Sequence, residues 1–262
     1  MHRDDHRLVF VGGLHRSGTT PLARCLAGHP EVSGFSGTGV KEDEGQHLQS
    51  VYPTARDHGG PGRFAGAAAA HLTEESDLAT EANADRLFEQ WRPHWDLTRP
   101  VLLEKSPPNL LMTRFLQAMY PEASFVIAVR HPVTVALSTR KWVGGSWRKL
   151  FDNWFHAHDV FSADAPRLGR LRVVKYEDLV TQAAPTLAVI ATFLGLHGAI
   201  AADGIEQHRS VAYESQWRQL KESARPWDRR TYRGLCRDYE HRASHYGYSL
   251  EDLGYCAPFP TG

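Results

Sequence analysis

The chain has 262 residues, a length that predicts one domain spanning residues 1–262. Hydrophobic residues make up 42% of it and charged residues 23%, which is typical of a globular protein and excludes a disordered chain. Lys and Arg together number 30, and Asp and Glu together also number 30. Because this balance leaves no general positive field, we expect no nucleic-acid partner, and any anion-binding site must be local.

The cysteines and the amino terminus bear on the compartment in which the protein works. Cys25, Cys236 and Cys256 are odd in number and lack the paired spacing of a metal site, so we expect neither a disulfide framework nor a bound metal. The apolar stretch after the charged first residues ends at Gly12, too short for a signal sequence or a membrane span. These features predict a cytoplasmic protein without a membrane span.

The predicted secondary structure alternates between short strands and helices. Apolar runs rich in β-forming residues predict strands at residues 8–11, 101–103, 124–129 and 171–174. Helical patterns predict helices at residues 19–27, 42–51, 64–71, 77–91, 109–119, 132–141, 147–161 and 183–194. This alternation predicts an α/β fold: a central, mainly parallel sheet flanked by helices, with a phosphate-binding loop after the first strand as in P-loop NTPases.

The glycine turn after the first strand has the spacing of a nucleotide phosphate loop. Residues 13–20 read Gly-Leu-His-Arg-Ser-Gly-Thr-Thr, which matches the pattern G-x-x-x-x-G-K-[ST] except that Thr19 replaces the lysine. Loss of that lysine disfavours triphosphate chemistry, whereas backbone amides and a helix dipole can still hold a single phosphate-like group. The alternative is a glycine turn with an exposed arginine. The candidate ligands are His15, Arg16, Ser17, Gly18, Thr19 and Thr20.

A second candidate anion site follows the most apolar predicted strand. Arg130 stands directly after residues 124–129, and Ser138 follows eight positions later in a helix predicted to begin at Pro132. Ligands of α/β sheets bind at the carboxyl ends of the strands. The arginine and the serine together can therefore hold a second phosphate, although Arg130 alone is also consistent with a structural hydrogen bond.

These two motifs, in this order, resemble those of the sulfotransferases that use 3′-phosphoadenosine 5′-phosphosulfate (PAPS). Residues 16–20 are similar to the family's 5′-phosphosulfate loop. The stretch from Arg130 to Ser138 is similar to its 3′-phosphate motif. The resemblance covers about residues 8–195 and implies PAPS as the donor, without a metal. It assigns no role to residues 196–262.

Two further segments extend the resemblance. Residues 103–107 are similar to the segment that supplies a catalytic lysine, which is Lys105 here. Residues 175–179 are similar to the segment whose tyrosine, here Tyr176, lies near the adenosine. Each residue has a plainer interpretation, since Lys105 can pair with its neighbour Glu104 on the surface and Tyr176 can be a core residue.

Transfer to a hydroxyl group needs a general base, and the candidates lie in residues 40–47, Val-Lys-Glu-Asp-Glu-Gly-Gln-His. Glu44 is our first choice because the segment that it begins resembles the Glu-x-Gln/His-apolar segment of carbohydrate sulfotransferases. Glu42 and His47 are the alternatives, and a solvated helix start is the plainer interpretation. The tyrosylprotein branch carries its glutamate at the position of Gly37, so this chain departs from that branch.

The function that the resemblance implies is transfer of a sulfuryl group from PAPS to a small-molecule, carbohydrate or lipid acceptor. The accepting group is a hydroxyl or an amine, and the reaction is an in-line displacement with a carboxylate as general base. Two other classes fit the loop alone. A nucleotide kinase or other NTPase with a degenerate loop would need Mg²⁺ and a replacement lysine, and a non-catalytic nucleotide-binding protein would keep the loop without turnover.

Overall fold

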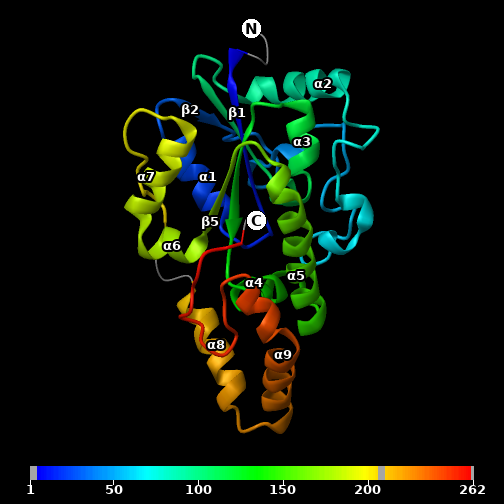
Figure 1. The fold of residues 1–262 in the computed structure, drawn as a ribbon, viewed down its shortest axis with the longest axis vertical. Coiled ribbons are helices and arrows are strands. Elements are labelled where there is room, and N and C mark those ends of the chain that lie inside the picture. Colours follow the sequence, from blue (N-terminus) through cyan, green and yellow to red (C-terminus); the bar gives the residue numbers. More distant parts are fainter. Residues whose placement is uncertain (1–4, 206–209, 261–262) are drawn as a thin grey trace.

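The computed structural model of the protein describes residues 5–205 and 210–260, and within these ranges five strands form one sheet (Figure 1). Their order is β2-β3-β1-β4-β5, and each neighbouring pair is parallel. The predicted α/β class with a parallel sheet is confirmed, and the edge strand β2 was not predicted. The strands are β1 (Arg7–Gly13), β2 (Val32–Gly34), β3 (Val101–Lys105), β4 (Ser124–Val129) and β5 (Leu171–Lys175).

Both faces of the sheet are buried, which explains why its central strands are continuous apolar runs. In β1, Val9 and Val11 belong to the core on one face, and Leu8 and Phe10 belong to the core on the other. Charged side chains follow these apolar runs at the carboxyl ends of the strands: in β3 they are Glu104 and Lys105, its last two residues. The core therefore confines the chemistry to the carboxyl edge of the sheet.

Helices cover the two faces of the sheet (Figure 1). The face that carries Val9 and Val11 packs against α1 (Thr19–Ala27), α6 (Tyr176–Thr181) and α7 (Ala183–Leu194). The opposite face packs against α2 (Glu81–Trp91) and α3 (Thr113–Met119), and against α4 (Pro132–Val143) and α5 (Trp147–Asp164) nearer the carboxyl edge.

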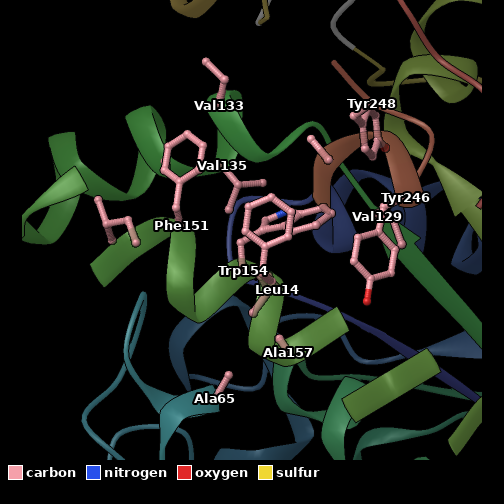
Figure 2. Close-up of a cluster of buried hydrophobic side chains, with 14 of the residues drawn as sticks. Leu14, Ala65, Val129, Val133, Val135, Phe151, Trp154, Ala157, Tyr246 and Tyr248 are labelled. Carbon is pink, nitrogen blue, oxygen red and sulfur yellow. The ribbon is translucent and has the colours of Figure 1, made fainter. Parts of the chain in front are cut away.

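The carboxyl-terminal part of the chain completes the core beyond the carboxyl edge of the sheet. The two helices of this part lie side by side there (Figure 1). Figure 2 shows Tyr246 and Tyr248, which follow the last helix, around Trp154 of α5 and near Val129 of β4. The described residues after 209 thus share one core with β4 and α5. The helices are α8 (Val211–Glu222) and α9 (Pro226–His245).

The prediction of a helix at residues 42–51 is wrong. This segment forms two short 3₁₀ turns, Lys41–Asp43 and Gly45–His47. Glu42 and Asp43 adopt left-handed backbone angles, with φ of 54° and 50°, which an α-helix of L-residues cannot contain. The interpretation of the acidic run as a solvated helix start is therefore also wrong.

The prediction of a helix at residues 64–71 is wrong as well. Two 3₁₀ turns, Phe64–Gly66 and Ala68–Ala70, take its place. The amide of Ala65 donates to Asn153 Oδ1 at 3.2 Å, so a contact with α5 competes with the local helix. Tertiary packing outweighs the helix propensity of the alanine run here.

The remaining predicted helices are present with small changes at their ends. The helix predicted at 77–91 begins at Glu81, because the hydroxyl of Thr80 caps it. The helix predicted at 109–119 is divided into a 3₁₀ turn, Pro107–Leu111, and α3. None of the helices in the described part of the chain combines the length and the hydropathy that a membrane crossing needs.

Candidate functional site

The polar residues singled out in the sequence meet at the carboxyl edge of the sheet, where parallel α/β sheets bind ligands. Arg16 lies in the loop after β1, Lys105 ends β3, Arg130 follows β4 and Tyr176 follows β5. Because β1 lies between β3 and β4, its loop has a different neighbour on each side. We name these two regions the anion side, made of residues 13–18, Arg130, Ser138 and Tyr176, and the carboxylate side, made of Lys105 and residues 41–47.

The loop after β1 is shaped for close approach of its backbone to a ligand. Arg16 and Gly18 have left-handed backbone angles, with φ of 74° and 95°, and such turns gather amide groups into anion-binding concavities. A Cβ on Gly18 would lie 2.2 Å from the ring of Tyr176, so only glycine fits. Leu14 anchors the loop in the core (Figure 2), and α1 begins directly after it. The positive end of that helix therefore adds to the local attraction for an anion.

Arg130 connects the elements of the anion side. Its Nη1 donates to the carbonyl oxygen of Arg16 at 3.0 Å, and its Nη2 donates to Ser210 Oγ at 2.8 Å. Its guanidinium lies 4.0 Å from the centre of the Tyr176 ring. The side chain is buried, and its Nε has no hydrogen-bond partner among the described residues, which is unusual for a buried donor.

Ser138 reaches the same region from α4, but its contact is with the loop arginine. Arg16 Nε donates to Ser138 Oγ at 2.7 Å, and Tyr213 OH donates to the same oxygen at 3.3 Å. Ser210 and Tyr213 were not predicted as site residues, because the family resemblance ends before them. The local sequence around α8 did not mark these two residues as a site either, since hydroxyl-bearing side chains are common on polar helices.

On the carboxylate side, Lys105 is almost completely buried, with 5% of the residue exposed. Its Nζ donates to the carbonyl oxygen of Glu42 at 2.8 Å and lies 3.4 Å from Glu44 Oε1. It also lies 3.4 Å from Thr20 Oγ1. The interpretation of Lys105 and Glu104 as a surface pair is wrong, because both residues are buried.

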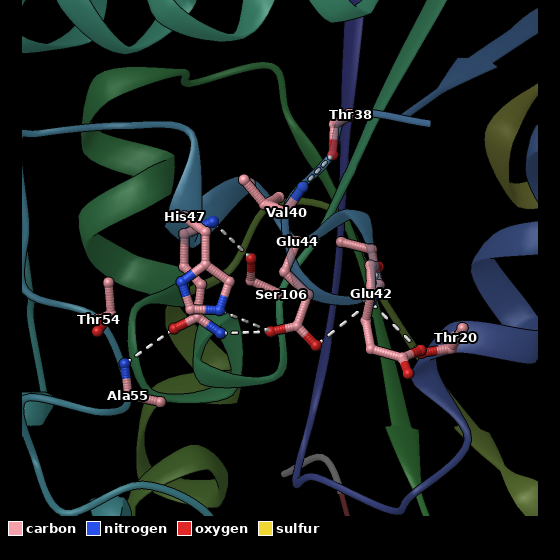
Figure 3. Close-up of polar contacts among 12 residues, drawn as sticks. Thr20, Thr38, Val40, Glu42, Glu44, His47, Thr54, Ala55 and Ser106 are labelled. Carbon is pink, nitrogen blue, oxygen red and sulfur yellow. Dashed lines mark hydrogen bonds and ion pairs between the residues drawn. The ribbon is translucent and has the colours of Figure 1, made fainter. Parts of the chain in front are cut away.

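The three candidate bases differ in their surroundings. Glu44 is 6% exposed, and its Oε2 accepts from Gln46 Nε2 and lies 3.8 Å from His47 Nε2 (Figure 3). The side chain of Glu42 is exposed and accepts from Thr20 Oγ1 at 3.4 Å. Glu44 is therefore the carboxylate that faces the buried lysine, whereas Glu42 contributes its backbone carbonyl to that lysine.

His15 belongs to the loop of the anion side, yet its ring faces the carboxylate side. Burial, together with the nearby charges of Lys41 and Lys105, lowers the pKa of His15 to about 3. The ring lies 5.3 Å from the ring of Phe64 and 6.1 Å from that of Trp142. His15 is therefore a neutral imidazole near pH 7, buried between the loop and these two aromatic rings.

A cavity of about 480 Å³ opens beside Lys105, Thr20 and Glu42. It runs between α1 and the segment after β2, and its far end is lined by Phe35 and Arg99. None of the residues that define the anion side contributes to its lining. The cavity therefore gives access to the buried lysine from a direction other than the anion loop.

The fold and the site together define a P-loop-like α/β protein whose glycine loop after β1 lacks the usual lysine. The chain matches the model of the Sulfotransferase family over residues 9–199, and it belongs to this family. The matched range contains the anion loop, the carboxylate side and Arg130, and it ends before Ser210 and Tyr213.

Two curated relatives are protein-tyrosine sulfotransferases. That of Drosophila melanogaster is 29% identical over 196 residues, which cover 71% of this chain and 38% of the relative. Protein-tyrosine sulfotransferase 2 of Gallus gallus is 27% identical over 198 residues, which cover 72% and 51% of the two chains. The chain thus spans about half or less of the length of these relatives.

A solved structure shares the fold. The sulfotransferase domain of the Synechococcus olefin synthase superposes with a TM-score of 0.52 at 22% identity. The superposition covers 80% of this chain and 87% of that domain. The similarity supports the central parallel sheet and its flanking helices as the common architecture.

Proposed function

We propose that the protein is a sulfotransferase that moves a sulfuryl group from PAPS to an acceptor hydroxyl. The observation that carries this proposal is the position of the anion loop between the buried Arg130 and the pair formed by Lys105 and Glu44. A phosphoryl-transfer enzyme with this loop would need its lysine and Mg²⁺. A sulfuryl group carries less charge, so arginine, lysine and backbone amides suffice to stabilise the transition state. Membership of the Sulfotransferase family supports the same reaction.

The anion side is proposed to bind the donor. The loop amides, the start of α1 and the side chains of Arg16 and Ser17 would hold the 5′-phosphosulfate, and Arg130 and Ser138 would hold the 3′-phosphate. Tyr176 would contact the adenosine. Two observations fit a ligand with several oxygens: Ser17 Oγ and Arg130 Nε are both buried without a partner among the described residues, and such groups normally have one.

The carboxylate side is proposed to carry out the transfer. The acceptor oxygen attacks the sulfur while the bond from the sulfur to the bridging oxygen breaks. The acceptor proton goes to the Glu44 carboxylate, and the leaving adenosine 3′,5′-bisphosphate keeps the electron pair of the broken bond. Lys105 stabilises the charge that develops on the leaving oxygen. The short separation of Glu44 and Lys105 supports this division of roles, since one group receives the proton and the other stabilises the leaving group.

The acceptor is proposed to enter through the cavity beside Lys105. Its lining contains hydroxyl, carboxylate and aromatic groups, which suit a polar acceptor with at least one hydroxyl. Small molecules, carbohydrates and lipids remain the predicted classes, and the names of the relatives add tyrosine peptides. Gly37, where the tyrosylprotein branch has its glutamate, lies on an exposed loop with a φ of 65°. The cytoplasmic location stays a prediction.

Calorimetry with adenosine 3′,5′-bisphosphate in the absence of Mg²⁺ tests the proposal. We expect binding without the metal and much weaker binding of Mg-ATP. Preference for Mg-ATP would instead support a kinase or another NTPase. A screen with labelled PAPS and acceptors of the four classes (small molecules, carbohydrates, lipids and tyrosine peptides) then separates an enzyme from a nucleotide-binding protein without turnover.

A further inference from the structure

Glu104 directly precedes Lys105 in β3, and its side chain is completely buried. Neighbouring residues of a strand point to opposite faces of the sheet, so Glu104 and Lys105 contact different parts of the segment that crosses the end of β3. Burying a carboxyl group costs free energy unless hydrogen bonds compensate for the lost water. A buried glutamate at this position therefore requires a dedicated set of donors.

The carboxyl oxygens of Glu104 accept three hydrogen bonds. Oε1 accepts from Gly45 N at 3.0 Å and from Ser106 Oγ at 2.6 Å, and Oε2 accepts from Asn109 Nδ2 at 2.5 Å. Ser106 Oγ in turn accepts from Gln46 N at 2.9 Å (Figure 3). Two successive backbone amides of the carboxylate side are thus bound to Glu104, one directly and one through a hydroxyl group.

The fit between Glu104 and Gly45 is tight. A Cβ on Gly45 would lie 2.4 Å from Glu104 Oε1, so no other residue can bring its amide this close to the carboxyl group. On the other side of the same peptide, Trp91 Nε1 donates to the carbonyl oxygen of Gly45 at 3.0 Å. The backbone at Gly45 is therefore fixed from two directions, which accounts for a glycine in the middle of the candidate base segment.

We propose that Glu104 is a positioning residue for the transfer reaction: through Gly45 and Gln46 it holds Glu44 against Lys105. Glu44 precedes the two bound amides, and its Oε1 lies 3.4 Å from Lys105 Nζ. Gln46, whose amide is bound to Ser106, also donates its side chain to Glu44 Oε2. Glu104 acts through these residues and does not itself contact the reacting groups. The catalytic meaning of this role rests on the proposed function.

The first test measures the position of the segment and needs no activity. Above about pH 7, where the Glu104 carboxyl is ionised, both of its oxygens accept; Glu104→Gln keeps the size of the side chain, but its amide nitrogen is a donor and cannot accept from Asn109. Because one bond of the set is lost, we expect hydrogen exchange of the amides in residues 45–48 to become about tenfold faster. Exchange of the β1 amides should stay unchanged. Unchanged exchange in residues 45–48 would overturn the proposal.

Asp164→Asn is the matched control for this test. Asp164 is also a buried carboxylate, and it binds His71 and Arg114 in a different part of the protein. The substitution should lower the thermal stability without changing exchange in residues 45–48. Faster exchange there in this control would show that any loss of stability loosens the segment, and it would contradict a specific role of Glu104.

The second test asks whether Glu104 acts through Glu44. Release of adenosine 3′,5′-bisphosphate from PAPS, with water as the acceptor, should fall about tenfold in Glu104→Gln, while bisphosphate affinity stays within about twofold. In a Glu44→Gln background the same substitution should cost less than about threefold, since no base remains to be positioned. Equal losses in both backgrounds would show a merely structural role and overturn the proposal.

Ser106→Ala keeps the proposal testable if Glu104→Gln does not fold. It removes the hydroxyl that joins Gln46 N to Glu104, so exchange in residues 45–48 should again increase and turnover should fall in the same direction. Wild-type-like exchange in this variant would overturn the inference. Failure of the wild-type protein to bind adenosine 3′,5′-bisphosphate would reject the proposed function instead, and the exchange results would still decide the positioning role.

Discussion

On the anion side, Ser17 Oγ and Arg130 Nε are buried without a hydrogen-bond partner among the described residues. Glu44 on the carboxylate side, and Glu104 directly behind it, are each bonded to several groups of the protein itself. At these two atoms a ligand can therefore gain hydrogen bonds without displacing internal ones. The carboxylate side is already ordered before any ligand arrives.

This contrast indicates how the two sides contribute to the proposed reaction. Groups that bind the donor equally in the ground state and the transition state change affinity, whereas groups that act only in the transition state change turnover. We expect substitutions on the anion side to act mainly on nucleotide affinity. Substitutions on the carboxylate side should act mainly on the rate. Each of the following predictions would sharpen or remove this division.

The largest effect is expected for Glu44→Gln, which keeps the shape of the side chain and removes its basicity. A general base contributes about 10²- to 10⁴-fold to a rate, so kcat should fall by about that factor while bisphosphate affinity barely changes. Single-turnover assays with labelled PAPS measure the rate, and calorimetry measures the affinity. Glu42→Gln is the control and should keep most of the activity. A large loss in Glu42→Gln with an active Glu44→Gln would reverse the assignment.

The next effect is expected on the anion side, for Arg130→Ala. Hydrogen bonds to charged groups are worth about 1.5–3 kcal/mol, so adenosine 3′,5′-bisphosphate should bind roughly 10- to 150-fold more weakly. Adenosine 5′-phosphate, which lacks the 3′-phosphate, should lose less affinity in the same calorimetric titration. Arg140→Ala serves as the control, because that exposed arginine stacks on Trp147 instead. Equal losses for the two nucleotides would remove Arg130 from the 3′-phosphate site.

Two buried groups, each next to one of the two sides, should also respond to pH in opposite directions. Burial lowers the pKa of His131, next to Arg130, to about 4 and raises the pKa of Glu104 to about 7. Because unfolded histidine binds a proton near pH 6.5, the stability contributed by neutral His131 is lost as the pH falls from 6.5 to 4. Because unfolded glutamate releases its proton near pH 4.5, the contribution of protonated Glu104 is lost as the pH rises from 4.5 to 7.

Urea unfolding at a series of pH values separates these two contributions. His131→Asn, which keeps a residue suited to the start of α4, should remove about 1–3 kcal/mol of the acid-dependent loss. Burial also lowers the pKa of His158 to about 4. In His131→Asn, the acid-dependent loss of stability that comes from His158 should therefore remain. Glu104→Gln should flatten the opposite slope between pH 4.5 and 7. If a variant shows the wild-type dependence of unfolding free energy on pH, over pH 4–6.5 for His131→Asn or pH 4.5–7 for Glu104→Gln, the substituted residue does not titrate as described.

The smallest effects are expected for substitutions at the Ser138 hydroxyl, beginning with Ser138→Ala. Its hydroxyl accepts from Arg16 and Tyr213, and a neutral hydrogen bond is worth about 0.5–1.5 kcal/mol. Bisphosphate affinity should therefore fall about two- to tenfold, with turnover at saturating PAPS unchanged. Tyr213→Phe removes one of the two donors and should have a smaller effect in the same titration. A selective loss of turnover in Ser138→Ala would contradict the division between the two sides.

The sequence by itself predicted the parallel α/β fold, a phosphate-type loop with Arg16 after the first strand, and Arg130 at the carboxyl edge of the sheet. These predictions depend on local features: apolar runs that form strands buried on both faces, and polar residues that begin where a strand ends. Such features are readable because each lies within a few residues of chain. The family resemblance added the donor and the roles of these residues, and the family itself is confirmed.

Only the tertiary structure decided how the segment around Glu44 is arranged. Its acidic residues and spacing predicted a helix, yet Glu42 and Asp43 are left-handed and the segment crosses the end of β3 instead. The structure placed Glu44 at Lys105 and Gly45 at Glu104 because β2, β3 and β1 are neighbours in the sheet although β2 and β3 are far apart in the chain. It likewise brought Ser210 of the carboxyl-terminal part to Arg130. Contacts between distant segments set the backbone here, and local propensity is too weak to predict them.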